Sequence, residues 1–293
     1  MTSTTDRAAG AGRGLRTAQA YSPRPLTDGE RWTAQALGAL RAGRYAPDAW
    51  ARFVRDSLQR ADSARRERPR LARQSRRWGL TGAVGWLAAC RLTRSRPQLN
   101  LRPLGGLMWW LAVWQMLDWH LGMAEGGDGR PRSRLSPADA VTLGRFWLVP
   151  LAPAVTRSER GLALLIIVGG LTDALDGQLA RRCGRTRLGR DLDTTADLAF
   201  LTAAGLAARR AGRLPAPAAC ALGARFALGV VLSLTAAFGR SRRPAIRARR
   251  GGAALRICGL ALCAAERPRA GSTIMTAGCL TPPRSTASHY SRA

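Results

Sequence analysis

Apolar and polar residues are segregated along the chain. Residues 1–77 are polar and rich in arginine, and their low-complexity beginning predicts disorder there. Thr27 and Glu30 have the spacing of a capping box, which predicts a helix over Glu30–Arg41. A second helix is expected over Asp48–Ala64, because its apolar residues recur on one face opposite arginines. The two helices either pack on each other as a hairpin or lie on an anionic lipid surface.

Apolar segments begin at residue 78 and predict membrane helices. The segment Trp78–Cys90 is short for a span, whereas Leu104–Met123 is long enough to cross a bilayer. A polar linker over Glu125–Asp139 precedes four further apolar segments joined by arginine-rich loops. These segments are Ala140–Val155, Gly161–Ala180, Leu192–Ala208 and Pro217–Phe238. The pattern predicts an all-α fold, a polytopic transmembrane helical bundle with a basic, partly disordered N-terminal region.

The pattern weakens after residue 250. Ala253–Ala265 is apolar but short and is interrupted by Arg256, and no periodicity follows from Glu266 onward. The sequence therefore predicts four regions, in which the third is a helical core shortened at its C-terminal end. They are a basic cytoplasmic region over 1–77, one or two extra membrane segments over 78–124, the core over 136–265, and a disordered tail over 266–293.

Loop charges predict how the bundle is oriented. The loops 181–190 and 239–250, which alternation places on one side, hold more arginines than 157–160 and 209–213 on the other. Positive loops are retained in the cytoplasm. No apolar segment precedes residue 78, so we expect no cleavable signal peptide. The sequence predicts a multi-pass protein of the cell membrane with a cytoplasmic N-terminal region.

Composition removes several classes of function. The 293 residues contain 47 basic and 18 acidic side chains, a formal charge of +29, and every basic residue is arginine. Without lysine there is no Schiff-base enzyme and no phosphate loop with its invariant lysine. Six scattered cysteines without a C-x-x-C pair, and only two histidines, argue against a zinc site. Basic loops beside apolar segments favour anionic membrane lipids as partners, and no motif points to nucleic acid.

Four aspartates stand at the ends of two neighbouring apolar segments. Asp173 and Asp176 are three residues apart, Asp193 and Asp197 four, so each pair projects from one helix face. A short loop makes the helices antiparallel, and the pairs should face each other at the cytoplasmic mouth. Such crowded carboxylates call for divalent cations, and oxygen ligands suit Mg²⁺ or Mn²⁺. The alternative is that the aspartates pair with loop arginines.

The neighbouring residues suggest phosphate chemistry. Two ions can hold a pyrophosphate while one carboxylate accepts a proton from an attacking alcohol. Gly177 leaves space for a ligand beside the helix backbone, and Arg181 offers a planar guanidinium to phosphate. The pattern indicates a phosphoryl-group transferase that acts on a lipid diphosphate.

One stretch closely resembles the signature of the CDP-alcohol phosphatidyltransferase family, which includes phosphatidylglycerophosphate and phosphatidylinositol-phosphate synthases. Its letters are Asp173-x-x-Asp176-Gly177-x-x-Ala180-Arg181 and Gly189-x-x-x-Asp193-x-x-x-Asp197. Every fixed letter matches. One departure is that seven residues separate Arg181 from Gly189, where the family usually has eight. The missing residue lies in the loop and leaves both aspartate pairs in register.

The resemblance implies an activity and a set of site residues. A member transfers a phosphatidyl group from a CDP-linked lipid, such as CDP-diacylglycerol, to an alcohol and releases CMP, in phospholipid biosynthesis. The four aspartates would bind two metal ions, and Asp197 would also be the catalytic proton acceptor. Gly177, Arg181 and Thr186 would contact the CDP moiety. The family also implies a homodimer.

Two further segments are similar to the family. Ser136–Arg145 resembles the opening of its first core helix, which contacts the nucleotide. Arg225 stands where some members place an arginine that meets the acceptor phosphate, although the glutamate that often follows is Phe226 here. Glycerol 3-phosphate, inositol phosphate, another phosphatidyl lipid and serine all stay open as acceptors, with a phosphorylated polyol favoured by the arginines.

Two alternatives to the transferase remain. Members have six core helices, and the sequence shows four convincing ones after residue 139, so an inactive membrane scaffold that binds CDP-lipid is one alternative. The other is a UbiA-like membrane prenyltransferase, which also holds Mg²⁺ and a lipid diphosphate between aspartate-rich helices. Its motifs differ in spacing and do not require the glycine, alanine and arginine that follow Asp176.

Overall fold

The computed structural model of the chain is almost entirely helical. It describes residues 27–95, 99, 101–126, 128–184, 186–238, 245–247, 250–281 and 284–286. Two three-residue strands, β1 (Ala245–Arg247) and β2 (Arg284–Thr286), pair antiparallel beside the helices. The predicted all-α class is confirmed. The disorder predicted at the start of the chain lies outside the described residues.

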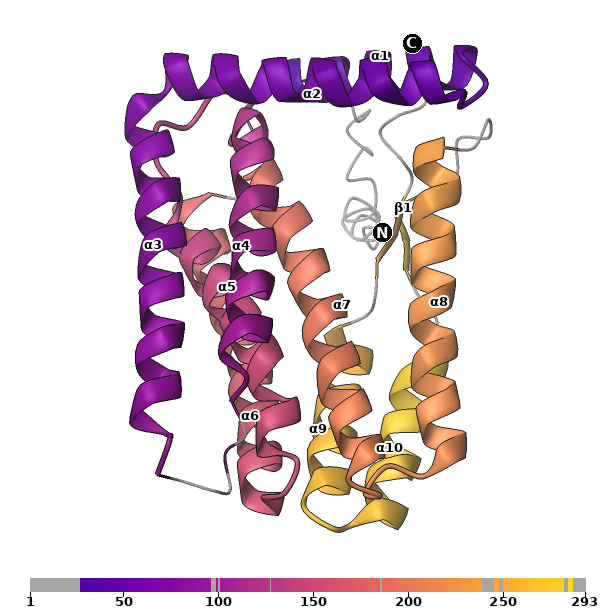
Figure 1. The fold of residues 1–293 in the computed structure, drawn as a ribbon. Helices are drawn as coiled ribbons and strands as arrows, with labels where there is room; N and C mark the ends of the chain where they lie inside the picture. Colours follow the sequence, from indigo (N-terminus) through magenta and orange to yellow (C-terminus); the bar gives the residue numbers. More distant parts are fainter. Residues whose placement is uncertain are drawn as a thin grey trace, which may run out of the picture.

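The first two helices lie across one end of the bundle formed by the others (Figure 1). They are α1 (Asp28–Ala42) and α2 (Pro47–Glu67). The predicted capping box is confirmed, since Thr27 and Glu30 each bond the other's backbone N–H. Helix α2 also contacts later parts of the chain, so α1 and α2 are not a separate hairpin.

An ion pair fastens α2 to the hairpin that follows. Arg65 on α2 pairs with Asp118, which is buried in α4 (Pro103–Trp119). The same guanidinium bonds Asp62 one turn earlier and lowers the pKa of that exposed carboxyl. Asp118 is an acidic residue within an apolar segment, and its partner is Arg65 of α2.

Helices α3 (Pro69–Leu92) and α4 form an antiparallel hairpin, and the 3₁₀ turn η1 (Leu121–Met123) follows α4. Helix α3 begins at Pro69 and continues through residue 78, so one helix crosses the predicted region boundary, and the division into regions stays a prediction. Proline suits the first helical turn, and arginines on an exposed face do not interrupt a helix.

Tryptophans of this hairpin pack against glycines. The Trp110 indole donates to the Gly79 carbonyl oxygen at 2.8 Å, and a Cβ on Gly82 would lie 1.8 Å from the Trp110 ring. The glycines therefore allow α3 and α4 to approach closely enough for the indole groups to find backbone acceptors.

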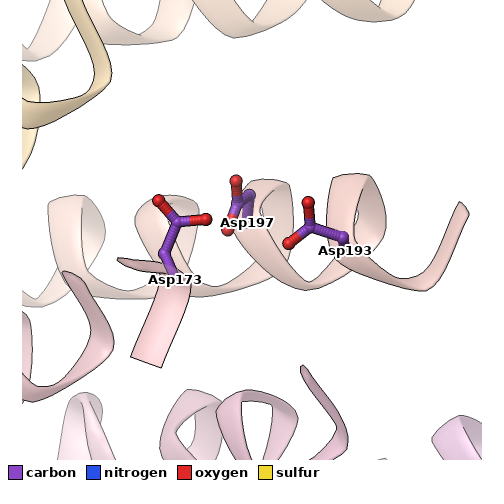
Figure 2. Close-up of side chains that lie close together, drawn as sticks. All are labelled: Asp173, Asp193 and Asp197. Atoms are coloured by element: carbon purple, nitrogen blue, oxygen red, sulfur yellow. The ribbon is translucent and has the colours of Figure 1, made fainter. Parts of the chain in front are cut away.

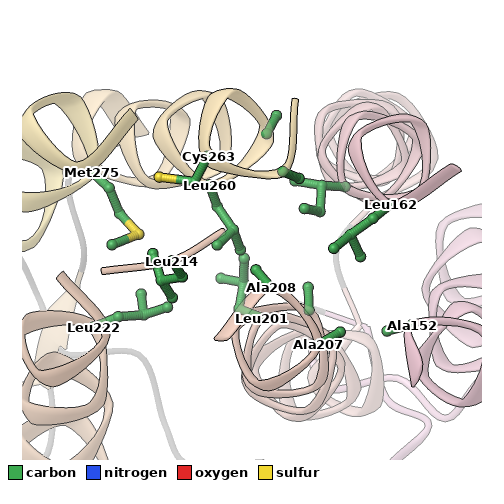
Figure 3. Packing of buried hydrophobic residues seen from close by; sticks show 14 of the residues in the cluster. Ala152, Leu162, Leu201, Ala207, Ala208, Leu214, Leu222, Leu260, Cys263 and Met275 are labelled. Atoms are coloured by element: carbon green, nitrogen blue, oxygen red, sulfur yellow. The ribbon is translucent and has the colours of Figure 1, made fainter. Parts of the chain in front are cut away.

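Six helices form the rest of the bundle in the described part of the chain. They are α5 (Pro137–Leu148), α6 (Glu159–Cys183), α7 (Arg187–Arg210), α8 (Ala216–Phe238), α9 (Arg250–Ala264) and α10 (Pro268–Leu280), with 3₁₀ turns η2 (Val149–Leu151) and η3 (Pro153–Val155) after α5. Helix α5 contacts both α6 and α7, while α9 contacts α6 and α10. Buried side chains from these helices, including Leu162, Leu260 and Met275, meet in one core (Figure 3).

The predicted shortening of this core is wrong. Helix α9 runs through Arg256, and α10 occupies residues 268–280 of the predicted disordered tail. The buried Arg256 side chain donates to the Gly278 carbonyl oxygen at 3.0 Å, so it does not break the helix. Glycine lowers helix propensity. At position 259, however, glycine is needed, because a Cβ there would lie only 2.4 Å from the Met275 nitrogen. These glycines let two short helices pack backbone against backbone.

One described helix, α6, is long and apolar enough to cross a membrane. Shorter apolar stretches lie at Ala216–Leu232 and Gly251–Ala264. The multi-pass topology and its orientation in the membrane therefore stay predictions. Successive core helices α6, α7 and α8 alternate in direction, as the predicted loop topology requires (Figure 1).

Close packing of α9 on α10 predicts a specific sensitivity. Gly259→Ala should destabilise the folded protein by about 1–3 kcal/mol, because its Cβ overlaps the α10 backbone. Thermal unfolding of purified protein in detergent measures this as a lower Tm. Gly251→Ala is the matched control, since a Cβ there meets nothing within 4 Å. Equal Tm values for the two variants would contradict the described hairpin.

Candidate active site

Three of the four motif aspartates converge between α6 and α7. One carboxylate oxygen from each of Asp173, Asp193 and Asp197 lies within 4.8 Å of the others (Figure 2). Their side chains are 36%, 41% and 43% exposed respectively. The expected facing of the two helices is thus present, and these carboxylates open to the outside of the helix pair.

Asp176 takes a different position. Its side chain is only 6% exposed, and it accepts a hydrogen bond from the Thr142 hydroxyl at 3.0 Å. Thr142 lies on α5, so Asp176 points inward to that helix. The structure separates the predicted quartet into three open carboxylates and one inward carboxylate that joins α6 to α5.

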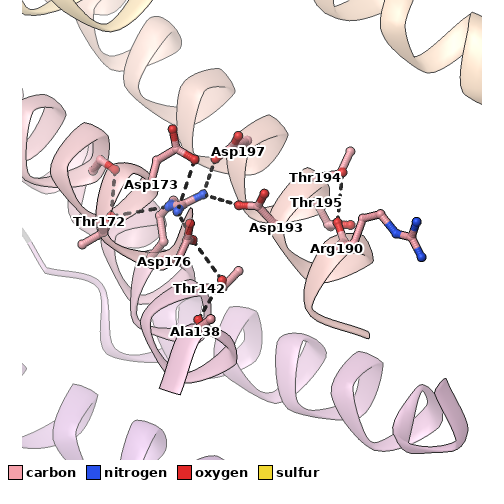
Figure 4. Close-up of polar contacts among 12 residues, drawn as sticks. Ala138, Thr142, Thr172, Asp173, Asp176, Arg190, Asp193, Thr194, Thr195 and Asp197 are labelled. Carbon is pink, nitrogen blue, oxygen red and sulfur yellow. Dashed lines mark hydrogen bonds and ion pairs between the residues drawn. The ribbon is translucent and has the colours of Figure 1, made fainter. Parts of the chain in front are cut away.

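Arg145 of α5 stands among all four aspartates. Its guanidinium, 1% exposed, pairs with Asp193 at 3.0 Å and Asp173 at 3.7 Å. It also bonds Asp176 and Asp197 directly (Figure 4). One buried cation therefore connects the acidic turns of α6 and α7. Loss of one partner from a buried ion pair costs about 3–5 kcal/mol.

The sequence pattern did not single out Arg145 as a site residue. A usable signal was present, because Asp139, Thr142 and Arg145 follow one another at three-residue intervals. That spacing puts three polar side chains on one face of an otherwise apolar helix. All three are buried, so the polar face of α5 is the one turned to the site.

The starts of α5 and α7 are joined by hydrogen bonds. Ser136 and Asp139 form a capping box on α5, and Thr186 is the N-cap of α7. The Thr186 hydroxyl donates to Asp139 at 3.1 Å and accepts from the Gly189 N–H at 2.9 Å. A Cβ on Gly189 would lie 2.4 Å from the Asp139 carboxylate. The motif glycine is thus required by close approach of α5, and Thr186 already has two partners here.

Gly177 and Arg181 lie on α6 beyond the aspartates. A Cβ on Gly177 would meet one side chain within 4 Å, the Arg181 guanidinium at 3.5 Å. Arg181 itself is exposed. Open space therefore borders this side of α6, next to the converging carboxylates. The contact of Gly177 and Arg181 with the CDP moiety stays a prediction.

Helix α1 is also bonded to the start of α7 and to the linker before α5. The Gly29 N–H of α1 donates to the Glu125 carboxylate at 3.0 Å, and the Arg187 N–H donates to the Glu125 carbonyl at 3.0 Å. The Arg187 side chain also donates to the Thr33 hydroxyl at 3.1 Å. Hydrogen bonds therefore join α1 to Arg187, the residue that follows Thr186 at the start of α7.

The donor set fits a divalent metal ion. The three converging groups are all carboxylates, and oxygen donors are the ligands that Mg²⁺ and Mn²⁺ prefer. Their exposure leaves the cluster accessible from outside. Asp176 would support these three carboxylates indirectly, through its bonds to Arg145 and Thr142.

Comparison with known proteins identifies the family of the core. A family model described as CDP-alcohol phosphatidyltransferase matches residues 135–282, about half of the 293 residues. The match runs from the start of α5 to the end of α10 and leaves α1–α4 outside. No curated protein and no solved structure matches the chain. The resemblance carried by the motif is confirmed.

The central position of Arg145 predicts a large effect on stability. Arg145→Met should lower the Tm of the metal-free protein by about 5 °C or more, because four carboxylates then lack their shared cation. Thermal unfolding in detergent with a chelator measures this. Arg182→Met, at an exposed arginine of α6, is the control and should leave Tm unchanged. An unchanged Tm in Arg145→Met would show that the carboxylates do not need the guanidinium.

Proposed function

The chain belongs to the CDP-alcohol phosphatidyltransferase family, and we propose that it transfers the phosphatidyl group of CDP-diacylglycerol to an alcohol and releases CMP. Membership itself means that a substituted phosphate group passes from a CDP-alcohol to an acceptor. The observation that carries the proposal is the convergence of Asp173, Asp193 and Asp197 within 4.8 Å, in the family motif.

We propose that two divalent cations, Mg²⁺ or Mn²⁺, bind at the motif aspartates. When bound, they would neutralise the pyrophosphate and polarise its phosphoryl oxygens. Asp173, Asp193 and Asp197 would hold them, with Asp176 as the inward member of the set. The family generally uses divalent metal ions, and the oxygen-only cluster supports that choice.

The residues of the chain then have distinct roles. Gly177 leaves room for the nucleotide beside α6, and Arg181 meets a phosphate there. Asp197 accepts the proton of the acceptor hydroxyl as that oxygen attacks the β-phosphorus. The bond from this phosphorus to the bridging oxygen breaks, and CMP leaves with the electron pair. Asp197 is suited to this because its side chain is the most exposed of the four.

We propose a phosphorylated polyol as the acceptor. Arg225 on α8 and Arg256 on α9 are within electrostatic range of each other, and Arg256 is also within range of Asp197. The Nε of Arg256 is buried without a hydrogen-bond partner among the described residues. These two guanidinium groups in the core favour a substrate that carries its own phosphate.

The membrane arrangement is part of the proposal. The family is membrane-bound, and α6 is long enough to span. Helices α1 and α2 cover the end of the bundle at which α7 begins (Figure 1), and Asp193 lies near the start of α7, so we place this end at the cytoplasmic surface. Basic residues of α1 and α2 would meet anionic lipids there, and a homodimer stays a proposal from the family.

The two alternative functions lose their support. The scaffold hypothesis depended on a shortened core, and the described chain contains α9 and α10. The prenyltransferase hypothesis depended on aspartate-rich helices alone, whereas the family match covers all six helices after residue 135. Neither is favoured by a specific observation.

Removal of the proposed proton acceptor tests the function. Asp197→Asn should lower CMP release from CDP-diacylglycerol by about 100-fold or more, while CDP-lipid binding stays measurable. CMP release is measured with labelled donor lipid and each candidate alcohol, and the lipid product is identified. Asp191→Asn is the matched control, because Asp191 is exposed on the same helix and outside the cluster. Full activity in Asp197→Asn would remove the assigned role.

The acceptor proposal has its own test. Arg225→Gln should raise the KM for a phosphorylated acceptor about tenfold and leave the KM for CDP-diacylglycerol unchanged. Glycerol 3-phosphate and inositol phosphate are compared with serine in steady-state assays. Arg209→Gln, at an exposed arginine at the far end of α7, is the control. Equal use of serine and phosphorylated alcohols would contradict this choice.

A further inference from the structure

A cavity of about 930 Å³ lies where α3 ends and where the chain enters α6. Its lining comes from the C-terminal half of α3, from described residues between α3 and α4, from the first residue of α4, and from Arg157 before α6. Its walls are mainly apolar and include Val84, Leu87 and Leu101. The volume falls in the range of small-molecule and lipid sites, about 300–1,000 Å³.

Three arginines add positive charge to this apolar cavity. Arg91, Arg94 and Arg157 belong to its lining, and no acidic residue does among the described residues. All three side chains are exposed, and no ion pair involves them in the part of the chain described. Apolar walls with several guanidinium groups match a molecule that has acyl chains and an anionic phosphate head.

The cavity is separate from the proposed active site. Arg157 precedes the first turn of α6, whereas Asp173 lies well along the same helix. At 1.5 Å per residue, the 14 residues from Glu159, the first of α6, to Asp173 span roughly 21 Å along the helix axis. If α6 crosses the bilayer, the two sites belong to opposite leaflets.

The neighbouring surface of α3 supports a lipid occupant. Leu80, Val84 and Leu92 are 67%, 56% and 79% exposed, so an apolar strip leads along α3 to the cavity. Large apolar side chains exposed in a row mark a surface that contacts lipid or another protein. The three adjoining arginines favour the phosphate of a lipid.

We propose that this cavity binds an anionic phospholipid from the leaflet opposite the aspartate site. The arginines hold the phosphate head, and an acyl chain lies against Val84 and Leu87. The assignment is independent of the transferase function, since none of these residues belongs to the aspartate site. It gives the α3–α4 hairpin, which lies outside the family match, a binding role of its own.

Lipid retention by the full chain tests the proposal. Purified protein is released from nanodiscs that contain equal amounts of phosphatidylglycerol and phosphatidylcholine, and retained lipid is counted by native mass spectrometry. We expect phosphatidylglycerol to be retained preferentially. The combined change Arg91→Gln, Arg94→Gln and Arg157→Gln should lower its retention tenfold or more, on the basis of about 1 kcal/mol for each arginine.

Two further variants separate charge from shape. Arg209→Gln with Arg210→Gln removes exposed charges at the same end of the bundle and should retain phosphatidylglycerol as the unmodified chain does. Val84→Trp narrows the cavity without a change in charge and should also lower retention. Retention that is equal for the two lipids, or unchanged in the triple variant, overturns the proposal. Displacement of the lipid by excess inorganic phosphate, with no effect of Val84→Trp, would also overturn it, because the site would then take a free anion.

Discussion

Mutual repulsion among the motif carboxylates is the constraint on which this bundle depends. Two acidic helix turns face each other, and four negative charges so close together repel strongly unless cations stand among them. The chain supplies one such cation, the buried guanidinium of Arg145. Helix α5 must therefore pack between α6 and α7, and the contacts at the start of α7 follow from that position. Thr186 and Gly189 accommodate Asp139 because α5 comes so close.

The family core and the four preceding helices have different tasks. Helices α5–α10 form the acidic site and its surroundings. Helices α3 and α4 pack beside them, and tryptophan rings of this hairpin contact glycines. Trp109 donates to the Phe146 carbonyl oxygen at 2.9 Å, and Trp147 donates to the Gly82 carbonyl oxygen at 3.2 Å. These bonds join the added hairpin to α5, the helix that carries Arg145. The hairpin thus helps to fix the position of the helix that neutralises the site.

Much of this architecture was predictable from the sequence, because strong signals are local. Apolar segment lengths indicated α6, α7 and α8, and the capping box indicated α1. The motif spacing predicted that aspartates of α6 and α7 face each other, and three of them converge. Arg145 was missed because its partners come from two other helices, and because the three-residue spacing of Asp139, Thr142 and Arg145 marks a polar helix face without naming its partners. Helices α9 and α10 were missed because glycine and Arg256 lower helix propensity, whereas close backbone packing and a carbonyl partner offset this.

The attachment of α1 has a consequence for how the protein is made. Gly29 bonds a residue 96 positions later, and Thr33 bonds one 154 positions later. During synthesis the N-terminal helix leaves the ribosome long before Glu125 and Arg187 exist. Until these residues are synthesised, α1 lacks both hydrogen-bond partners. The contacts that hold α1 in place are therefore completed only after α7 has been synthesised.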